Sequence, residues 1–323
     1  MTSILTNVAA MAALQTLRTI GNEMETTQGR VSSGMRVGEA KDNAAYWSIA
    51  TTMRSDNKAL SAVQDALGLG AAKIDTAYAG MNAAIDVVKE IKAKVSAATE
   101  QGVDKAKVQE EITQLQQQLV SIASGASFNG QNWLVFDSEE DGAVADKTVV
   151  SGFIRSADGT VKLNTTIYKL NDDEAEGSLN VLFKTLGDDT DGAQGGILGS
   201  TADALEVEVV SDDWDSETTV VNMNITEYTD ADMADALSLV EAAFQAMTKA
   251  ASQLGSISMR IGLQEDFANQ LTDAIDKGIG RLVDADMNEE STRLKALQTQ
   301  QQLGIQSLSI ANSSAEGILQ LFR

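Results

Sequence analysis

The stretch LKALQTQQQLGIQSLSIANSSAEGILQLFR, from Leu294 to Arg323, decides how this chain must be built. At about 100° per residue along a helix, its large apolar residues fall into two separate rows. The first row contains Leu294, Leu297, Ile305, Leu308, Leu319 and Phe322, and the second contains Leu303, Ile310, Ile318 and Leu321. Only narrow polar strips with Gln301, Gln306 and Asn312 separate the rows. A helix that is apolar on two sides needs neighbours on two sides.

The N-terminal stretch has the same property. Its apolar residues fall on two roughly opposite faces, with Ile4, Val8 and Met11 on one and Leu17, Ile20, Met24 and Val31 on the other. Each large apolar side chain removed from water contributes roughly 1.5–3 kcal/mol, so neither end is expected to remain solvated. We therefore predict a self-assembling subunit whose two ends form the core of a polymer. The assembly contacts are predicted at Ile4, Val8, Met11, Leu17, Ile20, Met24, Leu303, Ile305, Leu308, Ile310, Leu319, Leu321 and Phe322.

The composition argues against several classes of function. None of the 323 residues is Cys or His, which removes disulfides, thiol nucleophiles, the usual zinc ligands and imidazole acid–base chemistry. We expect no enzyme activity, no cofactor and no bound metal. The net charge of −23 disfavours binding to nucleic acid or to an anionic membrane. The first cation is Arg18, so the N-terminus does not resemble a cleaved signal peptide, and secretion would need a dedicated export route.

Between the two ends, the apolar residues recur in alternating steps of four and three, which is the pattern of a coiled-coil seam. The repeat runs from Ile49 to Ala98, resumes from Val108 to Ile122, and returns from Met233 to Ile261. Gly102 is expected to break the first helix, and Asp104 and Asp230 are expected to cap the next two. This pattern predicts a mainly α-helical fold, a long coiled-coil or bundle stalk built from both chain ends.

The character of the chain changes between residues 137 and 235. This segment holds 24 Asp and Glu against 5 Lys and Arg, so it carries most of the negative charge of the chain. Short runs of alternating residues, separated by Asp- and Gly-rich turns, predict β-strands. The predicted strands are residues 148–154, 161–170, 179–183, 205–210 and 218–225. We therefore expect an acidic, β-rich outer domain inserted into the helical stalk.

Four short motifs resemble those of bacterial flagellins. GRVSSGMRVGEAKDNAA at residues 29–45 resembles the N-terminal signature of that family, and SFNGQNWL at residues 127–134 resembles its FNG turn. RLVDADM at residues 281–287 resembles its DADM motif, and IAN at residues 310–312, followed by Ile318 and Leu319, resembles its closing motif. The motifs occur in the family's order, and the resemblance covers about residues 1–136 and 232–323.

The resemblance implies a structural protein that polymerises into the flagellar filament for swimming motility. It implies a filament-core domain of residues 1–42 and 280–323, a helical shaft domain of residues 43–136 and 232–279, and an outer variable domain of residues 137–231. It also implies an extracellular location, reached by export without a cleaved signal peptide. The implied partners are other copies of the chain, with or without sister flagellins, an export chaperone, a filament cap and junction proteins.

The polar residues 34–43 are predicted to connect the core and shaft layers. The resemblance implies that this connector lies between the core and shaft layers, so we hypothesise ion pairs between copies at this point. The residues that form them are predicted to be Arg30, Arg36, Lys41, Asp284 and Asp286.

Two alternative functions remain open at this stage. A flagellar hook–filament junction protein would share the two ends but would cap a filament instead of extending it. A surface adhesin or an enzyme built on a flagellin scaffold would need a binding site within residues 137–231. Elongation from filament seeds separates the first alternative from a filament subunit, and ligand screening of the insert tests the second.

Overall fold

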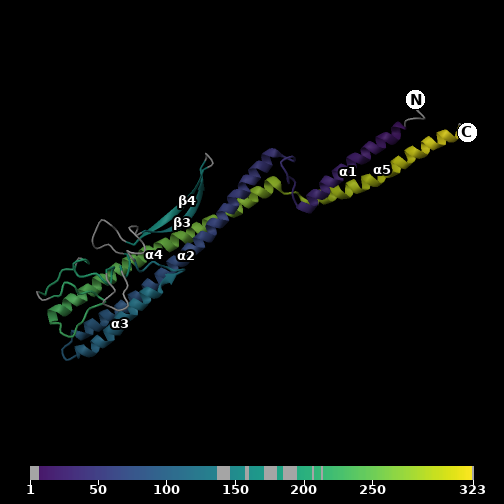
Figure 1. The fold of residues 1–323 in the computed structure, drawn as a ribbon. Helices are drawn as coiled ribbons and strands as arrows, with labels where there is room; N and C mark the ends of the chain where they lie inside the picture. The colour runs from purple at the N-terminus through teal and green to yellow at the C-terminus, as the bar shows by residue number, and fades with distance from the viewer. Residues whose placement is uncertain are drawn as a thin grey trace. The chain divides into compact units, whose positions relative to one another are not determined.

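The computed structural model describes residues 7–136, 146–156, 160–170, 180–184, 195–205, 207–211 and 214–321. The helices are α1 (Val8–Ser33), α2 (Ala44–Ala98), α3 (Lys105–Gly125), α4 (Asp230–Val283) and α5 (Met287–Leu321). The strands are β1 (Ser127–Phe128), β2 (Gln131–Asn132), β3 (Asp146–Arg155) and β4 (Val161–Lys169). The chain is mainly helical with a small β-containing insert between α3 and α4, which confirms the predicted fold class (Figure 1).

The chain forms two compact units. One contains residues 1–59 and 271–323, and the other contains residues 60–270. The long helices α2 and α4 contribute residues to both units. The first unit holds the terminal helices α1 and α5, and the second holds α3, both β-hairpins and the larger core.

The core of residues 60–270 follows the repeat predicted from the sequence. On α2, the residues at alternating steps of four and three are buried from Leu60 to Ala98, whereas the earlier repeat residue Ile49 is exposed. The buried face of α4 is wider than the repeat, because Ala236, Leu239, Ala243 and Ala250 are enclosed as well. One apolar cluster joins α2, α3, α4 and the insert. The helices therefore pack as a bundle, with the insert covering part of it.

Local chemistry sets the helix ends. Gly34 ends α1 in the left-handed conformation, at φ 72°, and its N–H donates to the carbonyl of Arg30 at 2.8 Å. Gly102, with φ 97°, turns the chain after α2 as predicted. Asp104 stands at the N-cap position of α3, but its carboxylate makes no capping hydrogen bond. It lies instead 3.4 Å from the ammonium group of Lys107.

The predicted cap of α4 is displaced by one residue. Asp230 is already the first residue of the helix, and the capping pair is Thr229 with Asp232. The N–H of Thr229 donates to the Asp232 carboxylate at 2.8 Å, and the N–H of Asp232 donates to the Thr229 hydroxyl at 3.3 Å. This is the reciprocal arrangement of a capping box.

Asp232 and Asp235, at the start of α4, also bind the end of the insert. The Ser211 hydroxyl donates to Asp232, and the carboxylate of Asp235 accepts from the backbone N–H groups of Val210 and Ser211 at 2.9 and 2.8 Å. The hydrogen bonds from the Ser211 hydroxyl, and then from the backbone and hydroxyl of Thr229, hold the pKa of Asp232 below its ordinary value. Both carboxylates thus anchor the returning chain to the helix.

Two hairpins make up the regular β-structure of the described residues. β1 and β2 are joined by Asn129 and Gly130, both with positive φ, which is the geometry of a tight two-residue turn and fits the FNG motif. β3 and β4 pair antiparallel, with a bulge between Val150 and Gly152. Their register confirms the strands predicted at 148–154 and 161–170.

One face of the β3–β4 hairpin is packed on the helices. Val149, Thr166 and Tyr168 are buried on this face. The Tyr168 ring stacks on Trp133 with 6.0 Å between ring centroids. Gly70 of α2 leaves the space that Val149 occupies, because a Cβ there would collide with the valine side chain.

The other three predicted strands are wrong. Residues 180–184 and 218–225 each make only an isolated bridge, and the described residues between 205 and 210 form no strand. Val181, Leu182 and Phe183 are all fully buried, so this segment is enclosed on every side and does not alternate like a half-exposed strand.

Side chains of α3 make hydrogen bonds to the backbone of residues 220–225. The buried Gln116 amide donates to the carbonyls of Val220 and Met223 at 3.1 and 3.0 Å. The Gln109 amide oxygen accepts from the N–H of Ile225 at 2.9 Å. These bonds satisfy the buried backbone without a neighbouring strand.

Gly80 of α2 provides a test of this packing. A Cβ there would lie 2.7 Å from Leu134 Cδ1 and 2.8 Å from Ala126 Cβ, whereas a Cβ at Gly68 would meet nothing within 4 Å. Gly80→Ala should lower the free energy of unfolding by about 1–2 kcal/mol, because overpacking outweighs the gain in helix propensity. The matched control Gly68→Ala should raise it by up to about 1 kcal/mol. Thermal unfolding measures both, and a Gly80→Ala protein more stable than wild type would contradict the close approach.

Candidate functional site

The paired terminal helices α1 and α5 carry most of the residues that the sequence singles out. α1 begins at the N-cap residue Asn7, whose side-chain oxygen accepts from the N–H of Ala10 at 3.1 Å. The same side chain donates to the carbonyl of Ala311 on α5 at 3.0 Å. α5 begins after Asp286, whose carboxylate accepts from the N–H groups of Asn288 and Glu289 at 2.9 and 3.3 Å. Both helices therefore have defined starts.

The two helices run antiparallel and bury one side of each (Figure 1). Ala10, Ile20 and Thr27 of α1 and Leu297 of α5 are buried. A glycine permits close approach near the middle of the pair, because a Cβ at Gly304 would lie 2.8 Å from Leu17 Cδ2.

An ion pair closes the other end of the interface. Arg30 Nη1 lies 3.1 Å from Glu290 Oε1, and the side chain of Glu290 is only 8% exposed. The second carboxylate oxygen, Oε2, is buried and makes no hydrogen bond to any described residue. Sequence reasoning missed Glu290, because residues 260 positions apart leave no local pattern. This pair fixes the register of α1 on α5.

Of the nine predicted assembly residues whose side chains the structure describes, five lie largely outside this interface. Val8 is 66% exposed, Met11 58%, Leu303 56%, Ile305 56% and Ile310 68%. The half-buried residues are Leu17, Met24 and Leu308, and Ile20 is buried. Ile4, Phe322 and the side chains of Leu319 and Leu321 lie outside the described residues. The helix pair thus leaves large apolar side chains in contact with solvent.

The connector of residues 34–43 is held against the junction of α4 and α5 by backbone bonds. The N–H groups of Arg36 and Val37 donate to the carbonyl of Val283 at 2.7 and 3.2 Å. The N–H of Ala285 donates to the carbonyl of Gly34 at 2.9 Å. Met35 and Asp284 form an isolated antiparallel β-bridge. These backbone bonds therefore give the predicted connector a defined conformation.

Arg36 and Lys41 of the connector contact groups within the same chain. These groups are not the acids predicted as their partners in neighbouring copies. Arg36 Nη2 donates to the carbonyl of Leu282 at 3.3 Å. Lys41 lies 2.8 Å from Glu39, and this contact raises the pKa of Lys41. The carboxylates of Asp284 and Asp286 are exposed. The intrachain contacts leave both acids on the surface.

The hydrogen bonds of Asp42 shape the connector turn. Its carboxylate accepts from the backbone N–H groups of Glu39 and Gly38 at 3.1 and 3.0 Å. These two bonds hold the pKa of Asp42 below its ordinary value. The turn is therefore closed by a local side-chain bond.

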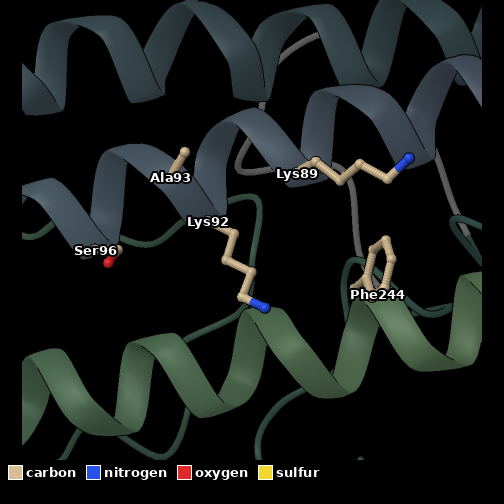
Figure 2. A pocket seen from close by; sticks show the side chains of 5 residues that line it. All are labelled: Lys89, Lys92, Ala93, Ser96 and Phe244. Atoms are coloured by element: carbon tan, nitrogen blue, oxygen red, sulfur yellow. The ribbon is translucent and has the colours of Figure 1, made fainter.

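The structure also contains a groove between α2 and α4. It has a volume of about 320 Å³ and is lined by Lys89, Lys92, Ala93, Ser96 and Phe244 (Figure 2). Figure 2 shows Lys92 reaching from α2 toward α4, and its ammonium group lies 2.5 Å from Glu241. Lys89 pairs with Asp86 at 2.9 Å and lies 6.0 Å from the Phe244 ring centroid. Both lysines that line the groove are therefore engaged in ion pairs with acids of the same chain.

Within the ranges that the structure describes, no group of three Asp or Glu residues is placed to hold a metal ion. None of the described helices combines the length and apolarity needed to cross a bilayer.

Comparison with known proteins identifies the family. Residues 4–136 match the bacterial flagellin N-terminal helical region, and residues 237–322 match the bacterial flagellin C-terminal helical region. Over the full length of both proteins, the chain is 52% identical to flagellin D and 54% identical to flagellin C of Rhizobium meliloti strain 1021. The chain belongs to the bacterial flagellin family. This flagellin is also 43% identical, again over the full length of both proteins, to a flagellin of Brucella melitensis biotype 1.

Family membership establishes the general function of the chain. This flagellin is a subunit of the extracellular flagellar filament, a structural protein and not an enzyme. The relatives that match over their full length are named flagellins, which favours a filament subunit over a junction protein. The paired terminal helices α1 and α5 lie within the two matched regions of the family.

The Arg30–Glu290 pair predicts how α1 and α5 hold together. Arg30→Gln leaves a buried carboxylate without its partner and should weaken the pairing of the two helices by about 2 kcal/mol. Hydrogen exchange of α1 and α5 in the monomer measures this loss. Arg30→Gln combined with Glu290→Gln should recover most of the protection. The exposed Lys41–Glu39 pair is the control, since Lys41→Gln should change nothing measurable. Equal protection in Arg30→Gln and wild type would refute the role of this pair.

Proposed function

We propose that α1 and α5 form the core of the filament, by burying their exposed faces against neighbouring copies. The supporting observation is that each helix covers only one side of the other. Val8, Met11, Leu303, Ile305 and Ile310 all remain more than half exposed. The predicted residues Ile4, Leu17, Ile20, Met24, Leu308, Leu319, Leu321 and Phe322 belong to the same proposed core.

The free energy of assembly comes mainly from these side chains. Each large apolar side chain removed from water contributes roughly 1.5–3 kcal/mol. Contacts with neighbours therefore stabilise the helix pair, and ordering of the ends is coupled to assembly. A free monomer is expected to hold its ends more loosely than a subunit in the filament.

The same proposal assigns layers to the chain. Residues 1–42 and 280–323 form the filament core, residues 43–136 and 232–279 form the shaft, and residues 137–231 form the outer variable domain. The strongly acidic composition of residues 137–231 supports an outer position, because it favours contact with solvent. The two matched family regions bracket this segment.

Further partners follow from the family resemblance. We infer an export chaperone that holds the C-terminal segment, a filament cap beneath which the polymer grows, and junction proteins at its base. Sister flagellins are candidate neighbours in a mixed filament. The apolar C-terminal helix α5 supports the need for a chaperone, because its exposed rows would otherwise favour aggregation before assembly.

We propose that the connector joins neighbouring copies through its charges. Arg30, Arg36 and Lys41 are the proposed cations, and Asp284 and Asp286 are the proposed acids. Support comes from the exposure of the side chains of Asp284 and Asp286 and from the exposed position of Arg36. Arg30 contributes less directly, because Glu290 already neutralises it.

The core proposal is tested by elongation from filament seeds. Ile305→Gln and Ile310→Gln keep helix propensity but remove apolar surface, so each should raise the critical concentration roughly ten- to a hundredfold. Gln306→Ala changes an exposed residue of the polar strip on the same helix and is the matched control, expected to elongate like wild type. Sedimentation and electron microscopy measure polymer mass. Normal elongation by both isoleucine variants would rule out the proposed core.

The connector proposal is tested by charge reversal. Arg36→Glu should lower the depolymerisation temperature of the filament at low salt, and the difference from wild type should shrink as salt screens the pairs. Combining it with Asp284→Arg should restore part of the loss if the two residues meet across copies. Depolymerisation temperatures that stay unchanged at every salt concentration would exclude the contact.

A further inference from the structure

The sulfur groups of the chain are all thioethers. The chain has 11 Met and no Cys, so methionine sulfur is its most easily oxidised side-chain group. Four of the described methionines are at most 1% exposed, namely Met81, Met223, Met233 and Met247. The apolar core of the bundle therefore shields these four from oxidants dissolved in water.

Three other methionines are open to solvent. Met259 is 70% exposed, Met11 58% and Met287 43%. The remaining described methionines are half-buried, and they are Met24, Met35 and Met53. Because a thioether must meet the oxidant to react, the three exposed methionines should be oxidised first.

Met11 differs from the other two exposed methionines in its position. It lies on α1 between two contacts with α5, the hydrogen bond from the Asn7 side chain and the close approach of Leu17 to Gly304. Its side chain nevertheless stays largely exposed, like that of Val8 one turn earlier. Met11 belongs to the predicted core of the polymer, and the other two exposed methionines do not.

Oxidation changes what it costs to bury this side chain. The thioether is flexible and apolar, whereas the oxygen of a sulfoxide is a strong hydrogen-bond acceptor. The predicted core residues are aliphatic side chains, Met and Phe, none of which can donate a hydrogen bond. An acceptor buried among them would lose its hydrogen bonds to water without replacement.

We propose that Met11 is an oxidation site that controls assembly, with a peroxide as the oxidant. In the free subunit the thioether is accessible and is converted to the sulfoxide, and the modified subunit then adds poorly to a filament. This inference rests on the proposed function, because only a side chain that becomes buried between copies is penalised for becoming polar. Filament growth thereby selects subunits whose N-terminal helix is chemically intact.

The reaction needs only the peroxide as co-reactant. The Met11 sulfur attacks one oxygen of hydrogen peroxide, so that an S–O bond forms as the O–O bond breaks. The sulfur is oxidised to the sulfoxide. The other oxygen is reduced, and it leaves with both protons of the peroxide as water.

Peroxide treatment of the full-length monomer tests the proposal. Peptide mass spectrometry follows each methionine, and fragmentation separates Met11 from Met1 within the tryptic peptide that ends at Arg18. The dose is chosen so that Met11 is oxidised while Met81 and Met247 are not, and thermal unfolding checks that the bundle is intact. Seeded elongation should then show a critical concentration raised about tenfold over that of untreated protein. Unchanged elongation of fully Met11-oxidised protein would overturn the proposal.

Leucine variants assign the effect to one sulfur. Met11→Leu removes the thioether and keeps the volume and helix propensity, and Met24→Leu and Met259→Leu do the same at a half-buried and an exposed position. Each variant is compared with its own untreated form, so an effect of the substitution itself cancels. Met11→Leu should elongate alike before and after treatment, whereas the other two should lose as much as wild type. An equal loss in Met11→Leu would place the effect at another residue and refute the proposal.

Oxidation of assembled filaments gives an independent readout. At the same dose, Met11 should be oxidised about tenfold more slowly in the filament than in the monomer, because burial limits reaction to local opening. Met81 should stay reduced in both forms. Equal rates for Met11 in monomer and filament would mean that its sulfur remains in solvent after assembly, and the proposal would fail.

The outcome separates this inference from the proposed function. If untreated wild type elongates and Ile305→Gln does not, while peroxide leaves elongation unchanged, the terminal core stands and the role of Met11 falls. If untreated wild type fails to elongate from seeds at all, the filament function and the role of Met11 fall together.

Discussion

The terminal helices have more apolar surface than they can cover for each other. α1 and α5 bury Ile20, Thr27 and Leu297 between them, and Gly304 lets Leu17 approach closely. Two packed helices contact each other along one side only, so apolar residues on their far sides, such as Ile310, stay exposed to solvent. In a family that builds filaments, this unmet burial supports our proposal that the terminal helices associate with other copies.

Specificity within the pair comes from polar groups. The Asn7 side chain binds the carbonyl of Ala311, and Arg30 pairs with the buried Glu290. Slippage of one helix along the other would break both contacts and leave a carboxylate buried alone. The apolar rows make the helices adhere, and these few bonds decide the register.

Long periodic features of the chain could be predicted from sequence, and features that depend on distant partners could not. The seam on α2 from Leu60 to Ala98 is visible because each turn repeats the same requirement for burial. The segment around Val220 looked like a strand because its residues are β-branched, but its hydrogen-bond partners are Gln109 and Gln116 of α3. Glu290 was missed because its partner, Arg30, lies at the other end of the chain. No single stretch of sequence contains such information.

The hydrogen bonds that the amides of Gln109 and Gln116 make to residues 220–225 go to main-chain atoms. Carbonyl groups are common to all residues and N–H groups to all except proline, so these hydrogen bonds depend on the path of the segment, while the side chains of Val220, Met223 and Ile225 are buried in the core. The returning chain can therefore keep its attachment to α3 while its solvent-facing residues drift. This gives the bundle a docking point that tolerates evolutionary change in the surface of the insert.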